Sequence, residues 1–302
     1  MKYSFNTWAF SSYPNWLPAY PIEEVIRRLS VLGYDAVELG CTAPHAWPDF
    51  MDKQDRKALL SFVKAHNMVF STLLPVTGVA AGANPASANA RERAWTVKHL
   101  CDICDLAADL ECRQILYVPG FFIYGTRRED AWRWALESLT AIGQHAQRLG
   151  IRLLIEPTPS DANLVETLDD AKELRAQSGL DNVDLMFDVA HALFRAEQPE
   201  DYVRLYGADI RHIHLSDYNR MAPGDSGYDF TEMMQALKDI SFDGYLTMEA
   251  AFTKRSEQPF TAARRAIEYL RGIEAPLRWA RTLKPPDTPA ADKAARLWEY
   301  IT

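Results

Sequence analysis

The sequence of 302 residues lacks a segment that could enter a membrane. No apolar run reaches the roughly 18 residues that a membrane-spanning helix requires. The first ten residues, MKYSFNTWAF, have polar Asn6 and Thr7 where a signal peptide would have an unbroken apolar core. We therefore expect a cytoplasmic protein that makes no contact with a membrane.

Positively charged residues are scarce relative to acidic ones. The chain has 33 Lys and Arg against 41 Asp and Glu, which gives a formal net charge of −8 and an isoelectric point near 5.4. No basic run is longer than a pair such as those at 127–128 and 264–265. A surface of this sign repels phosphate backbones, so we expect no nucleic-acid partner.

Cysteine is also rare, with four residues in the whole chain. Cys101 and Cys104 form a CxxC pair, which is a motif of zinc and redox sites, but no second pair completes a zinc site. Both lie in the helical pattern KHLCDICDLAADL at a spacing that directs them to one face. We interpret them as core residues.

Two glycine-rich motifs are missing as well. No dinucleotide-binding loop follows the first predicted strand, and no phosphate-binding loop follows the last one. The second absence favours a substrate without a phosphate group, although Lys254 and Arg255 in the last loop leave this question open.

The chain instead contains a regular alternation of two patterns. Short apolar runs bounded by turn residues are typical of buried parallel strands, and the amphipathic stretches between them are typical of helices. The predicted strands lie at 3–8, 35–40, 68–75, 113–120, 152–157, 183–188, 209–217 and 244–250. The predicted helices lie at 21–32, 52–66, 86–110, 128–149, 164–178, 199–206, 229–240 and 259–271.

Eight strand–helix units in about 250 residues have the size of a single (β/α)8 TIM barrel of the α/β class. The alternation also fits an open doubly wound sheet, but the count of eight and the missing dinucleotide loop favour the barrel. We expect residues 1–272 to form the catalytic barrel. Residues 273–302 are then a C-terminal helical extension, with a proline-containing linker and a helix over 292–301. We expect this helix to pack on the barrel, with a partner subunit as the alternative.

A potential metal ligand stands at the end of each of the last four predicted strands. In a TIM barrel, these strand ends form the active site. Because unpaired carboxylates are costly to bury, such residues after four apolar runs indicate a shared cation. Three oxygens and one nitrogen suit one divalent ion; we expect Mn²⁺ first, with Mg²⁺ and Co²⁺ as alternatives and zinc still open. The expected ligands are Glu156, Asp188, His214 and Glu249.

Two of these ligands, Glu156 and Glu249, follow strands five and eight, on opposite sides of the barrel mouth. A bound cation polarises a carbonyl group and acidifies the neighbouring C–H bond. One carboxylate could remove that proton and the other could return it from the opposite face. The pair therefore predicts epimerisation next to a carbonyl group.

Several other residues near these strand ends are candidates for the walls of a substrate pocket. They lie within or just after strands or in the aromatic first loop, and each also has an ordinary structural interpretation. The candidates are His191, Arg220, Glu38, His45 and Trp16. His212 points into the barrel interior like His214, and we expect it to support the site or the core rather than to bind the ion.

The motifs around these residues resemble those of the xylose-isomerase-like TIM-barrel superfamily, in particular its sugar phosphate isomerase/epimerase branch. The D-tagatose/D-psicose 3-epimerases and fructoselysine 3-epimerase are the members that the chain resembles most. The resemblance covers roughly residues 1–272. Its motifs are GYDAVELG with APHAWP, IEPTPSDANLVET, FDVAH, HIHLSDYNR with PGDSG, and GYLTMEA.

The resemblance implies roles for individual residues. The metal ligands of the family fall on the four expected ligands, and its catalytic pair falls on Glu156 and Glu249. Its substrate-binding His and Arg fall on His191 and Arg220. A further substrate-binding Glu of the 3-epimerases has no identical counterpart, and Asp161 is the nearest residue.

We accordingly expect a metal-dependent epimerase or isomerase of a ketose or keto-sugar, working through an enediolate and forming a homo-oligomer. The alternative is a lyase that performs β-elimination on a keto-sugar. The superfamily that the chain resembles includes inosose dehydratases and the catalytic subunit of C-glycoside deglycosidases. This subunit acts on 3-keto-glycosides together with a small β-rich subunit. A hetero-complex with such a subunit is therefore a second option. An apurinic endonuclease shares the barrel, but the acidic charge disfavours DNA repair; a non-catalytic binding barrel is the remaining alternative.

Overall fold

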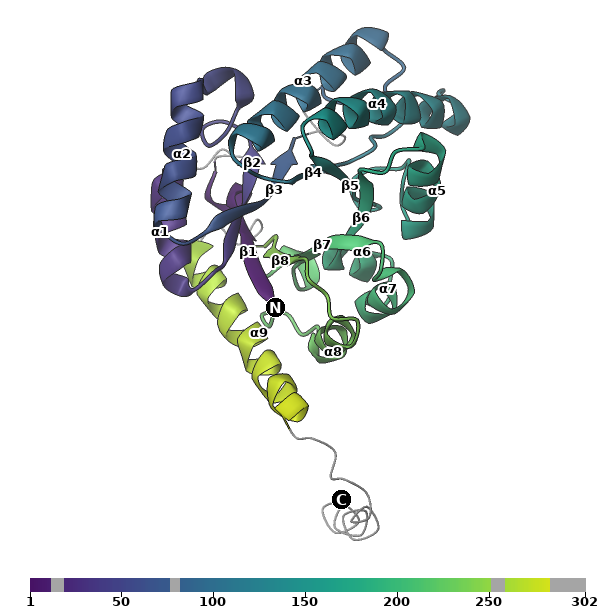
Figure 1. Ribbon diagram of the computed structural model, residues 1–302. Helices are drawn as coiled ribbons and strands as arrows, with labels where there is room; N and C mark the ends of the chain where they lie inside the picture. The colour runs from purple at the N-terminus through teal and green to yellow at the C-terminus, as the bar shows by residue number, and fades with distance from the viewer. Residues whose placement is uncertain (12–18, 77–81, 251–258, 283–302) are drawn as a thin grey trace.

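Eight parallel strands close into a barrel in the computed structural model of the protein, with helices on its outside (Figure 1). The structure describes residues 1–11, 19–76, 82–250 and 259–282. Each strand pairs with the next one along the chain, and β8 (Tyr245–Met248) pairs with β1 (Lys2–Asn6). This closure confirms the predicted TIM barrel and excludes the open sheet.

The remaining elements alternate around the barrel as predicted. The other strands are β2 (Ala36–Cys41), β3 (Val69–Pro75), β4 (Gln114–Tyr117), β5 (Arg152–Ile155), β6 (Val183–Asp188) and β7 (Ile210–Leu215). The α-helices are α1 (Ile22–Leu32), α2 (Lys53–Ala65), α3 (Ala90–Asp109), α4 (Arg128–Arg148), α5 (Leu168–Ser178), α6 (Val189–Phe194), α7 (Pro199–Tyr206), α8 (Thr231–Asp239) and α9 (Pro259–Thr282). Three short 3-10 helices are η1 (Thr7–Phe10), η2 (Pro48–Phe50) and η3 (Tyr218–Arg220).

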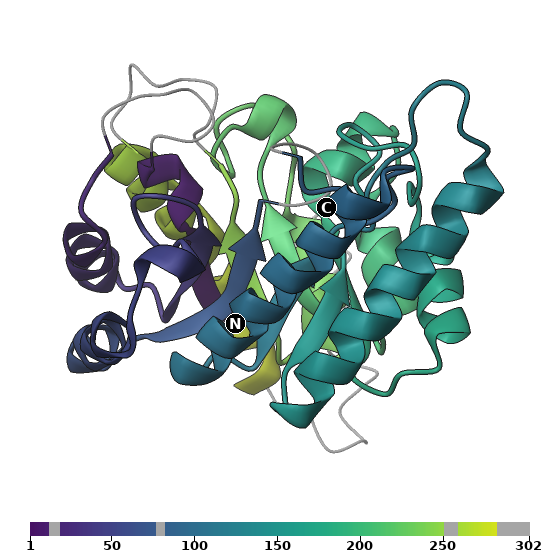
Figure 2. The same ribbon diagram turned by 90° about the horizontal axis from the view of Figure 1, so that it is seen from above.

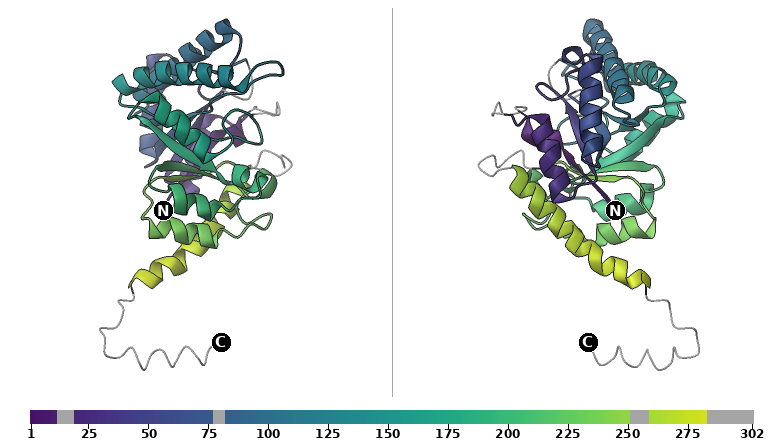
Figure 3. Two further views of the ribbon diagram at one scale, coloured as in Figure 1. Left: turned by 90° about the vertical axis from the view of Figure 1, so that its right-hand side faces the viewer. Right: turned by 60° about the vertical axis from the view of Figure 1, so that its left-hand side comes forward.

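The helices cover the outside of the strands. Helices α3 and α4 run side by side along them (Figure 2), and the C-terminal helix α9 packs against α1 and α8 (Figure 3). Within the described part of the chain, no helix combines the length and hydropathy that crossing a membrane would require. Trp16 and the helix predicted over 292–301 lie outside the described residues.

Three helix boundaries lie four or more residues from the prediction, for identifiable reasons. Helix α3 begins at Ala90 rather than at 86, because Asn89 caps it by accepting a hydrogen bond from the Arg91 N–H. Helix α5 begins at Leu168 rather than at 164, because Thr167 and Asp170 form a reciprocal capping box at its start. Helix α9 continues to Thr282 instead of ending at 271. A single glycine costs a helix only about 1 kcal/mol, and the buried Glu274, which accepts a hydrogen bond from Tyr3 Oη at 3.0 Å, holds the continued helix to the barrel.

The barrel interior is divided into an apolar part and a polar part. The apolar part is a small cluster beside Trp8, made of Leu74, Leu116, Leu154 and Met186. The Trp8 ring fits there because Gly40 has no side chain; a Cβ at Gly40 would lie 2.0 Å from Trp8 Cδ1. The polar part is unusual for a TIM barrel, whose interior is filled mainly by branched apolar residues. This polar part of the interior lies between the candidate site and the face of the barrel where the strands begin.

Candidate metal centre and active site

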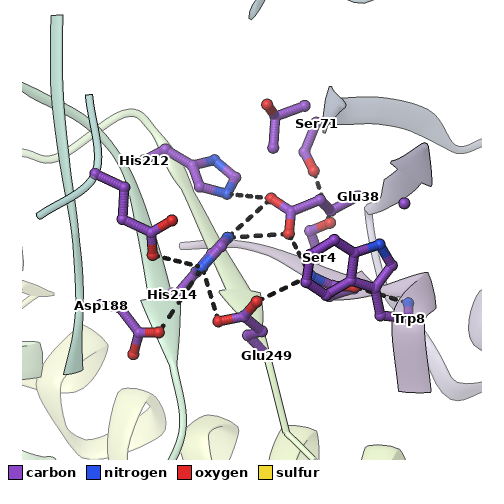
Figure 4. A network of polar contacts seen from close by, with 12 residues as sticks. Ser4, Trp8, Glu38, Ser71, Asp188, His212, His214 and Glu249 are labelled. Carbon is purple, nitrogen blue, oxygen red and sulfur yellow. Dashed lines mark hydrogen bonds and ion pairs between the residues drawn. The ribbon is translucent and has the colours of Figure 1, made fainter. Parts of the chain in front are cut away.

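Side chains from four neighbouring strands meet at the C-terminal mouth of the barrel (Figure 4). Glu156 directly follows β5, Asp188 ends β6, His214 lies in β7 and Glu249 directly follows β8. Asp188 pairs with His214 in the sheet register, which brings both to the same height. One ligand atom from each of the four residues lies within 4.8 Å of the others, and all four residues are buried. The structure thus brings all four predicted ligands together.

The Nδ1 atom of His214 is the centre of this cluster. It lies 3.1 Å from Glu249 Oε2, 3.4 Å from Glu156 Oε1 and 4.0 Å from Asp188 Oδ2. It is buried and has no partner with hydrogen-bond geometry. A buried nitrogen without such a partner, facing three carboxylates, fits a cation ligand. These residues can therefore hold a metal ion, and their donor set of one nitrogen and three oxygens suits a hard or borderline divalent cation.

The opposite nitrogen of His214 is held by Glu38, which lies below the cluster. His214 Nε2 is 2.9 Å from Glu38 Oε1, and His212 Nε2 is 2.9 Å from Glu38 Oε2. All three side chains are fully buried. We had expected Glu38 on the pocket wall; its position on the inward face of β2 instead turns both carboxylate oxygens toward the histidines.

The loop after β7 delivers Arg220 to the cluster. Arg220 Nη1 donates hydrogen bonds to Asp188 Oδ2 and to Glu249 Oε2, the latter at 2.7 Å. Asn219 and Arg220 adopt left-handed φ values of 57° and 58°, which cost roughly 1 kcal/mol or more for a residue other than glycine. The fully buried Asp217 carboxylate holds this loop by accepting hydrogen bonds from the backbone N–H groups of Tyr218, Ser226, Gly227 and Tyr228.

Two further predicted substrate-binding residues stand beside Arg220. His191 lies in α6, a short helix that the sequence analysis did not predict and that Asp188 caps. Its Nε2 is 3.3 Å from Arg220 Nη2 and 3.7 Å from Asp161 Oδ2. Ser160 Oγ lies 2.9 Å from His191 Nδ1 and orients the ring. Burial and the charge of Arg220 lower the pKa of His191 to about 3, so its imidazole is neutral near pH 7.

Of the remaining predicted pocket residues, His45 is bonded away from the cluster. Asn6, which was not predicted, contacts it. His45 is buried after β2, and its Nε2 lies 2.8 Å from the Tyr20 carbonyl oxygen. Asn6, which the sequence analysis did not select, donates to Glu38 Oε1 at 2.8 Å and to Glu249 Oε1 at 3.4 Å. Its signal was available, because Asn6 is a polar residue at the end of a strand.

The pKa values of the two glutamates in the cluster are shifted in opposite directions. The pKa of Glu156 is raised to about 7, mainly by burial; His214 opposes the shift, and the neighbouring Glu249 and Asp188 carboxylates add to it. Burial also acts on Glu249, but His214 and Arg220 outweigh it and lower the pKa of that carboxyl. Without a bound ion, the two glutamates therefore differ in proton affinity, with Glu156 holding a proton more readily than Glu249.

Comparison with known proteins gives the family. The model of the xylose isomerase-like TIM barrel family matches residues 26–273. The chain belongs to this family, and it is an enzyme, as the characterised relatives are. The resemblance inferred from the motifs is thereby confirmed.

The relatives include both an epimerase and a dehydratase. Fructoselysine 3-epimerase of Escherichia coli O157:H7 is 25% identical over 259 residues, covering 84% of this chain and 94% of its own. Inosose dehydratase of Lacticaseibacillus casei is 24% identical over 164 residues, covering 47% of this chain and 54% of its own. The crystal structure of D-psicose 3-epimerase with D-tagatose, from Clostridium cellulolyticum H10, has a TM-score of 0.77 at 18% identity. It covers 90% of this chain and 99% of that one, which shows a shared fold.

Proposed function

We propose that the protein is a divalent-metal-dependent epimerase or isomerase of a ketose or keto-sugar. The observation that carries this proposal is the pair Glu156 and Glu249, whose carboxylates lie 3.4 and 3.1 Å from the same nitrogen of His214. Their pKa values are shifted in opposite directions. Two carboxyl groups of unequal proton affinity at one site fit proton removal and return. The epimerase relative agrees with this reaction class.

In the proposed mechanism, the two glutamates exchange a proton with the carbon next to the substrate carbonyl. Glu249 is ionised near neutral pH and fits the base, while Glu156 can hold a proton and fits the acid. In the reverse direction their roles exchange. Loss of the proton gives an enediolate, and its return from the other face gives the epimer.

Residues around the pair would orient the sugar. Arg220, with its fixed positive charge, donates to oxygen atoms, and the neutral His191 ring exchanges hydrogen bonds with hydroxyl groups. Asp161 stands beside both residues, and 47% of its side chain is exposed. We assign these three residues to substrate binding.

Glu156, Asp188, His214 and Glu249 would hold the ion, which we propose to be Mn²⁺. When bound, a divalent ion supplies polarisation of the carbonyl and acidifies the adjacent C–H bond. We also propose a cytoplasmic homo-oligomer, with residues 273–302 as an extension that packs on the barrel or on a partner subunit.

The test is isotope exchange with candidate ketoses in D₂O in the presence of Mn²⁺. We expect an epimer or isomer that carries deuterium at the exchanged carbon. Glu156→Gln and Glu249→Gln should each lose 10²- to 10⁴-fold in turnover, while Glu173→Gln on the exposed face of α5 should keep it. Metal analysis of each variant separates loss of the acid or base from loss of the ion. A wild-type protein that binds no divalent ion and exchanges no proton would overturn the proposal.

A lyase acting by β-elimination is the second candidate, because the inosose dehydratase relative shares part of the chain. Elimination needs an acid close to the leaving group. His191 is a poor acid because its imidazole is neutral near pH 7, and His45 is bonded to the Tyr20 carbonyl. We therefore favour epimerisation. Turnover of a 3-keto-glycoside or an inosose without epimer formation would reverse that preference, and a hetero-complex with a small β-rich subunit would then be the expected assembly.

A further inference from the structure

A chain of hydrogen bonds crosses the barrel below the metal centre. It begins at the Ser71 carbonyl oxygen, which accepts from Gln114 Nε2 at 3.0 Å. Gln114 Nε2 also lies 3.5 Å from His212 Nδ1. From there the contacts continue through Glu38 to His214. Figure 4 shows the part of this chain around Glu38, with the rings of His212 and His214 both in contact with its carboxylate.

The direction of each hydrogen bond follows from the chemistry of the first one. A backbone carbonyl oxygen can only accept, so the Gln114 atom that contacts it must be the amide nitrogen. An amide nitrogen donates hydrogen bonds and accepts none. In its contact with Gln114 Nε2, His212 Nδ1 must therefore be the acceptor. The His212 proton is then on Nε2, which donates to Glu38 Oε2.

A second backbone group determines the other side of Glu38. The Trp8 N–H donates to Asn6 Oδ1 at 2.7 Å, so the Asn6 amide nitrogen faces Glu38 Oε1 and donates to it at 2.8 Å. Glu38 thus accepts hydrogen bonds from Asn6 and His212, and its Oε2 atom also lies 3.0 Å from His214 Nε2, with hydrogen-bond geometry. An ionised carboxylate only accepts, so His214 Nε2 carries a hydrogen.

These hydrogen bonds determine which nitrogen of His214 is available to bind the ion. With Nε2 of His214 committed to Glu38, only Nδ1 remains to face the three carboxylates. We propose that Gln114, His212 and Glu38 are positioning residues that select the metal-binding nitrogen of His214 from the opposite face of the barrel. This proposal rests on the proposed function, because it assigns the role through the metal centre.

The place of Gln114 makes the proposal open to experiment. Gln114 is half-buried and, with Ser71, lines a cavity of about 770 Å³ at the face of the barrel where the strands begin. A side chain there can change shape without leaving a closed hole in the core. The four ligands lie at the other end of the strands.

Gln114→Glu is the informative substitution, because a carboxylate accepts where the amide donated. Gln114→Met removes the bond without reversing it, and Gln147→Glu on the exposed face of α4 makes the same chemical change away from the chain. Long-range ¹H–¹⁵N NMR on protein labelled at histidine, without metal or with Mg²⁺, reports which ring nitrogen carries the hydrogen. The His212 signals are assigned by their loss in His212→Asn. Calorimetry measures Mn²⁺ affinity.

We expect the hydrogen of His212 on Nε2 in the wild-type protein and in Gln147→Glu. Gln114→Glu should move or add a hydrogen at Nδ1 and raise the Kd for Mn²⁺ about 10- to 100-fold, as changes to groups that orient ligands do; Gln114→Met should raise it less. A wild-type His212 with its hydrogen on Nδ1 overturns the proposal, as does Gln114→Glu with altered His212 signals and wild-type Mn²⁺ affinity. Absence of any divalent-ion binding by the wild-type protein instead overturns the proposed function, while the position of the His212 hydrogen still tests the chain.

Discussion

Arg220 Nη1 lies 2.7 Å from Glu249 Oε2, and the same nitrogen hydrogen-bonds to Asp188. One guanidinium thus serves as the counter-ion of two carboxylates that we assign to the metal. Because a divalent ion and a guanidinium are both cations, they oppose each other at this site. Arg220 therefore stabilises the cluster without the ion and reduces its affinity for the ion.

Arg220→Gln should accordingly change stability and metal affinity in opposite directions. Without metal, breaking this buried charge pair should cost about 3 kcal/mol in the free energy of unfolding. At pH 8 the Kd for Mn²⁺ should fall, because a nearby positive charge is removed, while turnover should drop as the sugar loses a partner. Urea unfolding and calorimetry check this, with the exposed Arg204→Gln as the control. Weaker Mn²⁺ binding by Arg220→Gln would contradict the counter-ion role.

Asp217→Asn should lower catalytic efficiency with the substrate and have a smaller effect on binding of the ion. The amide would present hydrogens to a group of backbone N–H donors that now meet a carboxylate. The loop that carries Arg220 should loosen, and we expect kcat/KM to fall about 10- to 100-fold. The Kd for Mn²⁺ should change less than it does in Arg220→Gln, because the guanidinium charge stays on the chain and the four ligands lie outside the loop that Asp217 holds. Asp229→Asn, at the start of α8, is the matched control; equal losses in both variants would show that the effect is not specific to the cage around Asp217.

Asp161→Glu should change sugar binding. Asp161 Oδ2 lies 3.7 Å from His191 Nε2 and 3.9 Å from Arg220 Nη2, beyond hydrogen-bond distance. One more methylene group would bring the carboxylate closer to the sugar site. For a small ketose we expect KM to fall about 2- to 10-fold, the value of one added hydrogen bond. Asp161→Asn keeps the length and removes the charge; an unchanged KM for every accepted sugar in both variants would argue against a binding role.

Acid should destabilise the protein through buried histidines. Burial lowers the pKa of His99, despite nearby Asp102 and Asp49, and that of His45, despite the Tyr20 carbonyl and Glu23. At these two histidines the unfolded chain therefore binds more protons than the folded one below about pH 6.5, so their contribution to stability falls as the pH drops. Each histidine can contribute up to about 1.4 kcal/mol per pH unit below that pH.

His99→Gln isolates one of these contributions, because all other titrating groups are common to both proteins. His99 lies between Trp47 and Trp95, with ring centroids 4.6 and 4.9 Å away. Urea unfolding at pH 7.5 and 5.5 should give a smaller loss of stability for His99→Gln than for the wild-type protein. Equal losses would mean that His99 does not titrate differently in the folded and unfolded states.

The main features of the site were predictable because they depend on strand periodicity. Each of the four residues follows a short apolar run, and parallel strands of a barrel end at the same face, so the meeting of Glu156, Asp188, His214 and Glu249 could be predicted without coordinates. The closure between β1 and β8 is not visible in any local pattern. It was inferred from the number of units, and the structure confirms it.

Other features could not be derived from local patterns. Glu38 was expected among the pocket residues around the second strand, and the register of β2 turns its carboxylate toward His212 and His214. Helix α6 is only one or two turns long, too short for a periodic signal. The N-cap of this helix is Asp188, which the sequence pattern predicted only as a metal ligand.

The amino-acid order by itself determined the eight units, the barrel class and the residues that can bind a cation, because these depend on period, composition and strand ends. Only the tertiary structure decided which nitrogen of His214 faces the carboxylates and where Arg220 stands. Those properties depend on contacts between β2, β4, β7 and the loop after β7, whose residues are far apart in the chain and meet only when the barrel closes.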